Sequence, residues 1–156
     1  MNRLSQLLAP ANVLVGSAAR DKSAALDLTA ALFASASGLS EEKIRASLAA
    51  REELGSTGLG LGVAIPHGRL RGAKQAVAAV VRLATPVAYD APDGRPVGLL
   101  VALLVPEHAT EAHLEVLSEV AQMLSDRDFR AAVMMAPDAA ALHALIGAWQ
   151  SIRPAA

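Results

Sequence analysis

The stretch GSTGLGLGVAIPHGR, residues 55–69, contains one histidine, His67, whose neighbours suit it to covalent chemistry. His67 lies between Pro66, which fixes the backbone angle before it, and Gly68, which leaves the other side of its ring uncrowded. Neutral imidazole is a competent nucleophile near pH 7 and can be modified covalently. A single histidine is most often a surface or satisfied core residue, but one held so rigidly beside hydroxyls and backbone amides favours a chemical role.

Side chains that suit a phosphoryl group lie close to this histidine in the sequence. The hydroxyls of Ser56 and Thr57, together with the loop amides, are suitable donors to phosphoryl oxygens. Arg51, just upstream, has a positively charged guanidinium whose forked N–H donors match the oxygens of a phosphate. Its spacing alone is more typical of a solvated residue at a helix end, so its role stays open at this point.

The other histidines differ in what their positions allow. His113 falls in the first turn of a helix that Thr110 is expected to cap, where the helix dipole favours a neutral ring able to donate to an anion. The same position also fits a histidine at the rim of the core. His108 is expected in a loop, and His143 has no assigned role. With no cysteine and no His-x-x-x-His pair, no metal site is expected.

The glycines Gly58, Gly60 and Gly62 do not match the common nucleotide-binding loops. A dinucleotide fingerprint follows a strand and opens a helix, whereas these glycines follow a helix, precede a strand and are spaced G-x-G-x-G. A Walker A loop ends in Gly-Lys-Ser/Thr, and the stretch contains no lysine. Without His67, these glycines would indicate only a flexible helix-to-strand connection.

The elements expected around this stretch alternate between helices and strands. Helical spacing runs from Lys22 to a stop at Gly38, and from a cap at Ser40 toward Glu52. The run VGLLVALLVP, residues 97–106, is apolar on both faces and predicts a strand in mid-sheet with helices on each side.

Weaker patterns complete the expected order of elements. Short strands are expected over 63–65, stopped by Pro66, and within the β-branched run 75–84. Further helices are expected after residue 110. The pattern predicts one α/β domain over residues 1–156.

The amino-acid composition limits which classes of partner and which cellular compartment suit the protein. Hydrophobic residues make up 53% and aromatic residues 3%, so the core must be built from Leu, Val, Ile and Ala. A net charge of -1 and few aromatic rings do not suit nucleic acid. The absence of cysteine excludes disulfides and thiolate catalysis and fits a reducing compartment. The longest apolar run, 97–106, is shorter than the ~20 residues that span a bilayer. We therefore expect a soluble cytoplasmic protein without membrane insertion.

Three segments together resemble a known family. REELGSTGLGLGVAIPHGRL, residues 51–70, closely resembles the active-site segment of the mannitol/fructose-type enzyme IIA domains of the bacterial phosphotransferase system, and most of all their nitrogen-regulatory form. DGRPVGLLVALLVPE, residues 93–107, and HLEVLSEVAQMLSD, residues 113–126, resemble the family's central strand and the helix after it. The resemblance covers roughly residues 3–150 and implies a mixed β-sheet with helices on both faces.

The resemblance also implies a role for each candidate residue. His67 would be phosphorylated transiently at Nε2, His113 would support the phosphoryl group without carrying it, and Arg51 would stabilise its charge. Ser56 and Thr57 would be hydroxyl donors. The donor would be a histidine phosphocarrier, HPr or its nitrogen-branch counterpart NPr, and no cofactor or metal is implied. The nitrogen-regulatory form would signal through its phosphorylation state to targets such as potassium-transport regulators or sensor proteins.

Other functions stay open from the sequence. A sugar-uptake EIIA would pass its phosphate to a separate IIB, since this chain has no cysteine to act as its own acceptor. A binding module that is never phosphorylated has no chemical need for Arg51, Ser56 and His113 beside His67. An unrelated histidine acid–base hydrolase would need a carboxylate near His67, and the stretch contains none after Glu53.

Overall fold

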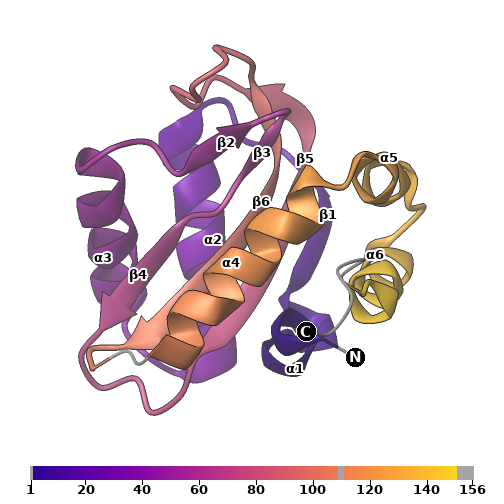
Figure 1. Cartoon of the computed structure of the whole chain (residues 1–156). Coiled ribbons are helices and arrows are strands. Elements are labelled where there is room, and N and C mark those ends of the chain that lie inside the picture. The colour runs from indigo at the N-terminus through magenta and orange to yellow at the C-terminus, as the bar shows by residue number, and fades with distance from the viewer. Residues whose placement is uncertain (1, 109–110, 151–156) are drawn as a thin grey trace.

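The computed structural model describes residues 2–108 and 111–150 of the chain (Figure 1). Its helices are α1 (Arg3–Leu7), the short 3-10 turn η1 (Pro10–Asn12), α2 (Lys22–Ser37), α3 (Glu41–Glu53), α4 (Glu111–Ser125), α5 (Arg127–Met135) and α6 (Ala139–Ala148). Its strands are β1 (Val13–Ser17), β2 (Gly58–Gly60), β3 (Val63–Ala64), β4 (His67–Leu70), β5 (Val77–Val87) and β6 (Val97–Pro106).

The strands form one mixed sheet with β6 near its centre. The order is β1-β5-β6-β3-β2, and β4 pairs with β6 beyond the end of β3. Strands β3 and β4 both run parallel to β6, and β1 runs parallel to β5. The pairs β5–β6 and β2–β3 are antiparallel. The expected α/β fold with a mixed sheet is confirmed.

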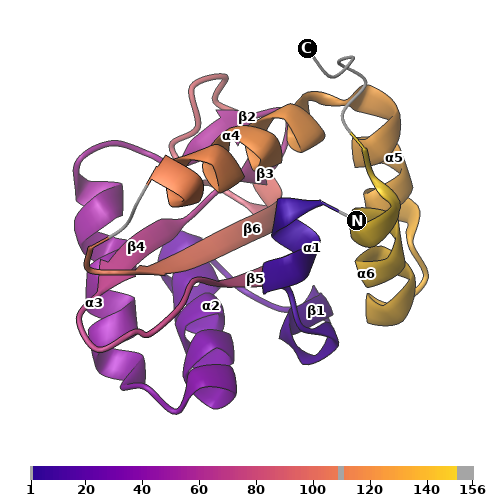
Figure 2. The same ribbon diagram turned by 60° about the horizontal axis from the view of Figure 1, so that its bottom comes forward.

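Helices cover both faces of the sheet, with α4 on one side and α2 and α3 on the other (Figure 2). The side chains of β6 alternate between the hydrophobic layers on the two faces of the sheet, because successive residues of a strand point to opposite faces. Leu99, Val101 and Leu103 pack in the core beneath α4. Leu100, Ala102 and Leu104 pack on the opposite face with α2 and α3. The expectation that residues 97–106 form a mid-sheet strand is therefore confirmed.

The helix ends follow the expected chemistry where the structure describes them. Ser40 accepts a hydrogen bond from Lys43 N as the N-cap of α3, and Gly38 ends α2 in the left-handed conformation with φ of 73°. The expected cap of α4, Thr110, lies outside the described residues. No helix in the described ranges has both the length and the apolar character needed to cross a membrane.

The segment around Pro66 differs from the sequence-based expectation. We expected Pro66 to stop a strand and leave His67 at its end. Instead β3 ends at Ala64 and β4 begins at His67, and both lie beside β6. Because proline lacks an N–H donor, strand pairing is interrupted at residues 65 and 66, and the chain pairs with β6 again from His67 onward. The carbonyl of Pro66 still accepts from Leu103 N at 3.0 Å. His67 therefore begins an edge strand.

Candidate active site

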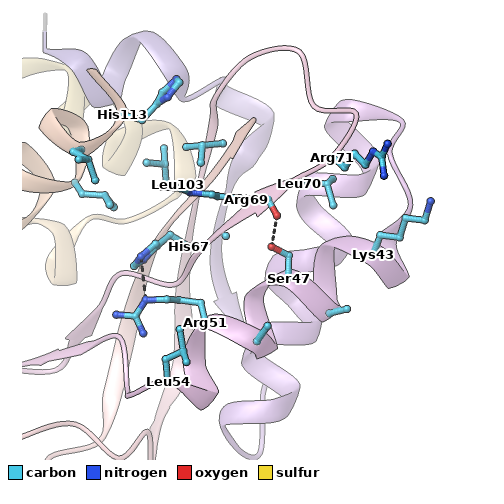
Figure 3. A pocket seen from close by; sticks show the side chains of 16 residues that line it. Lys43, Ser47, Arg51, Leu54, His67, Arg69, Leu70, Arg71, Leu103 and His113 are labelled. Atoms are coloured by element: carbon cyan, nitrogen blue, oxygen red, sulfur yellow. Dashed lines mark hydrogen bonds between the residues drawn. The ribbon is translucent and has the colours of Figure 1, made fainter. Parts of the chain in front are cut away.

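A cavity of about 860 Å³ opens at the edge of the sheet beside β4, between α3 and α4 (Figure 3). Its apolar wall includes Leu70, Leu103 and Leu117. The cationic side chains that line it are Lys43, Arg51, Arg69 and Arg71. The described lining residues include no aspartate or glutamate. A cavity with this charge favours an anionic group.

The hydrogen bonds of His67 fix which ring nitrogen carries the proton. Arg51 Nε donates to His67 Nε2 over 3.3 Å, and His67 Nδ1 lies 2.9 Å from the carbonyl oxygen of Ile65. A guanidinium only donates hydrogen bonds and a carbonyl only accepts them. Nδ1 must therefore hold the proton and Nε2 the lone pair. The nucleophilic atom of the ring is the one next to Arg51.

The interrupted edge strand supplies the carbonyl that orients this ring. Ile65 lies in the gap between β3 and β4, and its N–H donates to Thr57 O at 3.0 Å. A residue before proline is held in an extended conformation, which fixes the direction of its carbonyl. That carbonyl accepts from the ring two residues later. The local sequence Ile-Pro-His therefore sets the ring's tautomer.

The surroundings of His67 keep its ring neutral. Burial lowers the pKa of His67 below its ordinary value of 6.5. The hydrogen bond to Ile65 raises the pKa, the Arg51 cation lowers it and the charge of Glu52 raises it, with burial prevailing. At neutral pH the ring is thus available as a nucleophile.

Helix α3 positions the guanidinium of Arg51. Arg51 lies in the last turn of α3, and its Nη1 donates to Gly55 O over 2.8 Å while Nε contacts His67. Figure 3 shows the guanidinium directly beside the histidine ring. The structure thus brings together these two of the five candidates.

The hydroxyls of Ser56 and Thr57 are directed away from His67. Ser56 Oγ donates to Tyr89 O over 2.9 Å, and the buried Thr57 hydroxyl bonds to the Glu52 carboxylate. Neither residue lines the cavity. The expectation that they contact a phosphoryl group has no support in this geometry, because the loop turns toward Tyr89.

His113 shares the cavity but does not contact His67. It lies in the first turn of α4 and lines the cavity wall opposite α3. In Figure 3 its ring is turned away from His67. The structure therefore places His113 near the site without joining it to the pair of Arg51 and His67.

The glycines of the loop allow a tight backbone turn and do not line the cavity. Gly60, Leu61 and Gly62 have φ of 87°, 61° and 82°, and they turn the chain between β2 and β3. The Asp93 carboxylate accepts from Leu61 N at 2.8 Å and holds this turn. None of these residues lines the cavity. In this structure the glycines shape the hairpin between β2 and β3.

Sequence reasoning missed a buried polar cluster behind the site, formed by Lys22, Glu52, Thr57 and Tyr89. Lys22 Nζ lies 2.7 Å from Glu52 Oε2, and Tyr89 Oη donates to Glu52 Oε1 over 3.1 Å. Burial raises the pKa of Tyr89, so its hydroxyl stays protonated as a donor. The only sequence signal was the position of Glu52 next to Arg51. No spacing rule links Glu52 to residues 30 and more positions away.

Residues 6–148 match the family model described as "Phosphoenolpyruvate-dependent sugar phosphotransferase system, EIIA 2". The chain belongs to this family. The resemblance inferred from the three sequence segments is confirmed. Among the described residues of this EIIA chain, no group of three or more His, Asp or Glu side chains is placed to hold a metal ion.

Individual relatives point to one branch of the EIIA family. A nitrogen regulatory protein of Pseudomonas aeruginosa is 46% identical over 147 residues, which cover 94% of this chain and 96% of that protein. A nitrogen regulatory protein of Bradyrhizobium diazoefficiens is 35% identical over 92% of this chain and 94% of its own.

Solved structures agree with this placement. The crystal structure of nitrogen regulatory protein IIA-Ntr from Neisseria meningitidis has a TM-score of 0.88 at 41% identity, covering 93% of this chain and 99% of that chain. The mannitol IIA of Escherichia coli has a TM-score of 0.74 at 16% identity, covering 88% of this chain and 97% of that chain, and shows a shared fold.

Proposed function

We propose that this EIIA protein is a nitrogen-regulatory phosphoryl carrier of the phosphotransferase system. It accepts a phosphoryl group on His67 Nε2 from an HPr- or NPr-type phosphocarrier. It then signals through its phosphorylation state to regulatory proteins such as potassium-transport regulators or sensors. The relatives named nitrogen regulatory proteins support this branch. The lack of cysteine and the need to meet a phosphocarrier favour the cytoplasm.

The observation that carries the proposal is the paired hydrogen bonding of His67. Ile65 O holds the proton on Nδ1, and Arg51 lies against the lone pair of Nε2. A nucleophile needs its lone pair exposed to the incoming group and a cation beside the charge that arrives. At Nε2 the cation is already in place, and the lone pair becomes free for attack when Arg51 exchanges its bond to the ring for bonds to the phosphoryl oxygens.

The proposed transfer balances between two rings. The P–N bond of the carrier's phosphohistidine breaks, and its electron pair returns to the carrier's ring. A new P–N bond forms from the lone pair of His67 Nε2. His67 keeps its Nδ1 proton, so the ring becomes positive, and the Ile65 carbonyl stabilises that charge. The Arg51 N–H groups then bond to phosphoryl oxygens instead of the ring nitrogen, and positioning supplies most of the catalysis.

The test is incubation with phosphoenolpyruvate, enzyme I and HPr, or the nitrogen-branch equivalents, followed by intact-mass measurement at neutral to alkaline pH. We expect one acid-labile phosphate on the wild-type protein and none on His67→Ala. The variant should keep its fold because His67 is only half-buried at the sheet edge. Phosphate on the variant would place the acceptor elsewhere. A folded wild-type protein that takes phosphate from neither donor set would favour a binding module instead.

We propose that His113, on the α4 wall, supports the phosphoryl group once it is in place. The ring must first rotate, since it is turned away from His67 in Figure 3. His113→Ala should slow transfer about tenfold while leaving one phosphate at completion, as expected for the loss of one hydrogen bond to a charged group. Rapid-quench kinetics would measure this, and a wild-type rate in the variant would exclude the role.

A further inference from the structure

We infer that Glu52 is a positioning residue for phosphoryl transfer, and that it acts by holding Arg51 through the loop that starts at Gly55. The inference rests on the proposed function of His67 as acceptor. Glu52 does not line the cavity, and none of its described hydrogen bonds or ion pairs goes to His67. Its contacts run instead to the backbone and side chains behind the site.

The Glu52 carboxylate is held by donors from three other segments. Lys22 Nζ, at the start of α2, lies 2.7 Å from Oε2. Tyr89 Oη, from the connection between β5 and β6, donates to Oε1 over 3.1 Å. Thr57 donates its N–H to Oε1 over 3.1 Å and its hydroxyl to the same atom. Because only 6% of the Glu52 side chain is exposed, these bonds are shielded from water.

This arrangement closes a short loop around Arg51. Residues 51 and 52 lie in the last turn of α3, and the Glu52 carboxylate holds the chain again at Thr57, five residues later. Gly55 lies between the two clamped points, and its carbonyl accepts from Arg51 Nη1 over 2.8 Å. The position of that carbonyl therefore depends on the bond between Glu52 and Thr57. The same guanidinium reaches His67 Nε2 through Nε.

Among the described residues, Gly55 O is the only acceptor besides His67 Nε2 that bonds to the Arg51 side chain. Once phosphate occupies Nε2, Gly55 O is the remaining anchor among these two. A displacement of about 1 Å at a reacting group can cost up to ~100-fold in rate. The clamp at Glu52 thus sets the orientation of the guanidinium during transfer.

The first test compares Glu52→Gln with Glu53→Gln in rapid-quench transfer from the phosphorylated carrier. Both variants make the same change on the same helix, but Glu53 is exposed and has no described hydrogen bond or ion pair. We expect Glu52→Gln to lower kcat about tenfold with KM for the carrier unchanged, and Glu53→Gln to match wild type. A wild-type kcat in Glu52→Gln, or an effect confined to KM, would overturn the inference.

A double-mutant cycle with Arg51→Lys tests whether Glu52 acts through Arg51. If it does, Glu52→Gln should cost about tenfold in the wild-type background and less than about twofold when Arg51 is already replaced. Equal losses in both backgrounds would show that Glu52 acts independently. A wild-type protein that accepts no phosphate would instead defeat the proposed function itself.

A readout other than rate separates positioning from stability. The ¹⁵N resonance of His67 Nε2 reports the hydrogen bond from Arg51, and we expect it to shift in Glu52→Gln and stay unchanged in Glu53→Gln. Should Glu52→Gln fail to fold, Tyr89→Phe removes one donor to Glu52 while keeping the ring, and the same shift is expected at smaller size. An unchanged resonance in the folded variant contradicts the inference.

Discussion

The two nitrogens of the His67 ring have separate tasks. Nδ1 is tied to the Ile65 carbonyl and cannot take part in transfer, while Nε2 meets Arg51 with its lone pair. Arg51 therefore both opposes protonation of the nucleophile and lies ready for the charge of the phosphoryl group. The same guanidinium thus serves the resting state through its bond to Nε2 and the reacting state through bonds to the phosphoryl oxygens.

The ring of His67 should titrate below pH 6.5. Burial and the Arg51 cation lower the pKa in the folded protein, so the unfolded chain binds more protons at mildly acidic pH. The contribution of His67 to stability is therefore complete above pH 6.5 and declines as the pH falls below it. An NMR titration of the ring measures the pKa. Arg51→Ala should raise this pKa toward 6.5, and a value at or above 6.5 in the wild-type protein would contradict the prediction.

The contact between α3 and β4 is the element-scale feature that shapes the cavity. Helix α3 approaches the edge strand so closely at Gly68 that a Cβ there would overlap Ser47 Oγ and lie 3.2 Å from the Ser47 carbonyl carbon. Ser47 Oγ in turn donates to Arg69 O over 2.6 Å. The absence of a side chain at Gly68 thus lets α3 bring Arg51 to His67.

Gly68→Ala should destabilise the protein by about 1–3 kcal/mol, because the added methyl group must displace Ser47 and its bond to Arg69. Urea unfolding measures the change. Gly147→Ala is the matched control, since nothing lies within 4 Å of a Cβ at this α6 position. That control should stabilise by roughly 0.5–1 kcal/mol. A neutral result at Gly68 would show that α3 can move outward without cost.

At the scale of the whole molecule, the N-terminal segment closes onto α6. Asn2 Oδ1 accepts from Ser5 N over 2.8 Å as the cap of α1. Its Nδ2 donates to the carbonyls of Ile146 and Trp149 over 2.7 and 2.9 Å. One side chain therefore both begins the first helix and satisfies carbonyls at the end of α6.

Asn2→Ala should lower the free energy of unfolding by about 1–2 kcal/mol through loss of the cap and of the bonds to α6. Asn2→Asp separates these contributions, because it keeps the capping oxygen but has no amide to donate. We expect an intermediate loss for Asn2→Asp in urea unfolding. Wild-type stability in that variant would assign the whole effect to the cap of α1.

Local sequence rules predicted the helices and strands better than the contacts between them. The apolar run that forms β6 and the caps at Gly38 and Ser40 depend on neighbouring residues, and they were predicted correctly. The directions of Ser56 and Thr57 depend on Tyr89, which lies more than 30 residues away. Pairings over such distances arise from the packing of the whole sheet, and no local pattern records them. The family resemblance located His67, but not the cluster around Glu52.

The carbonyl that fixes the ring of His67 belongs to the backbone of Ile65. Every amino acid carries that group, so exchanging the side chain at this position cannot delete the hydrogen bond. The side chain at residue 65 can therefore change during evolution without altering which nitrogen of His67 reacts. Substitution of Pro66, by contrast, would affect the reacting nitrogen, because the missing N–H of Pro66 opens the gap in the strand.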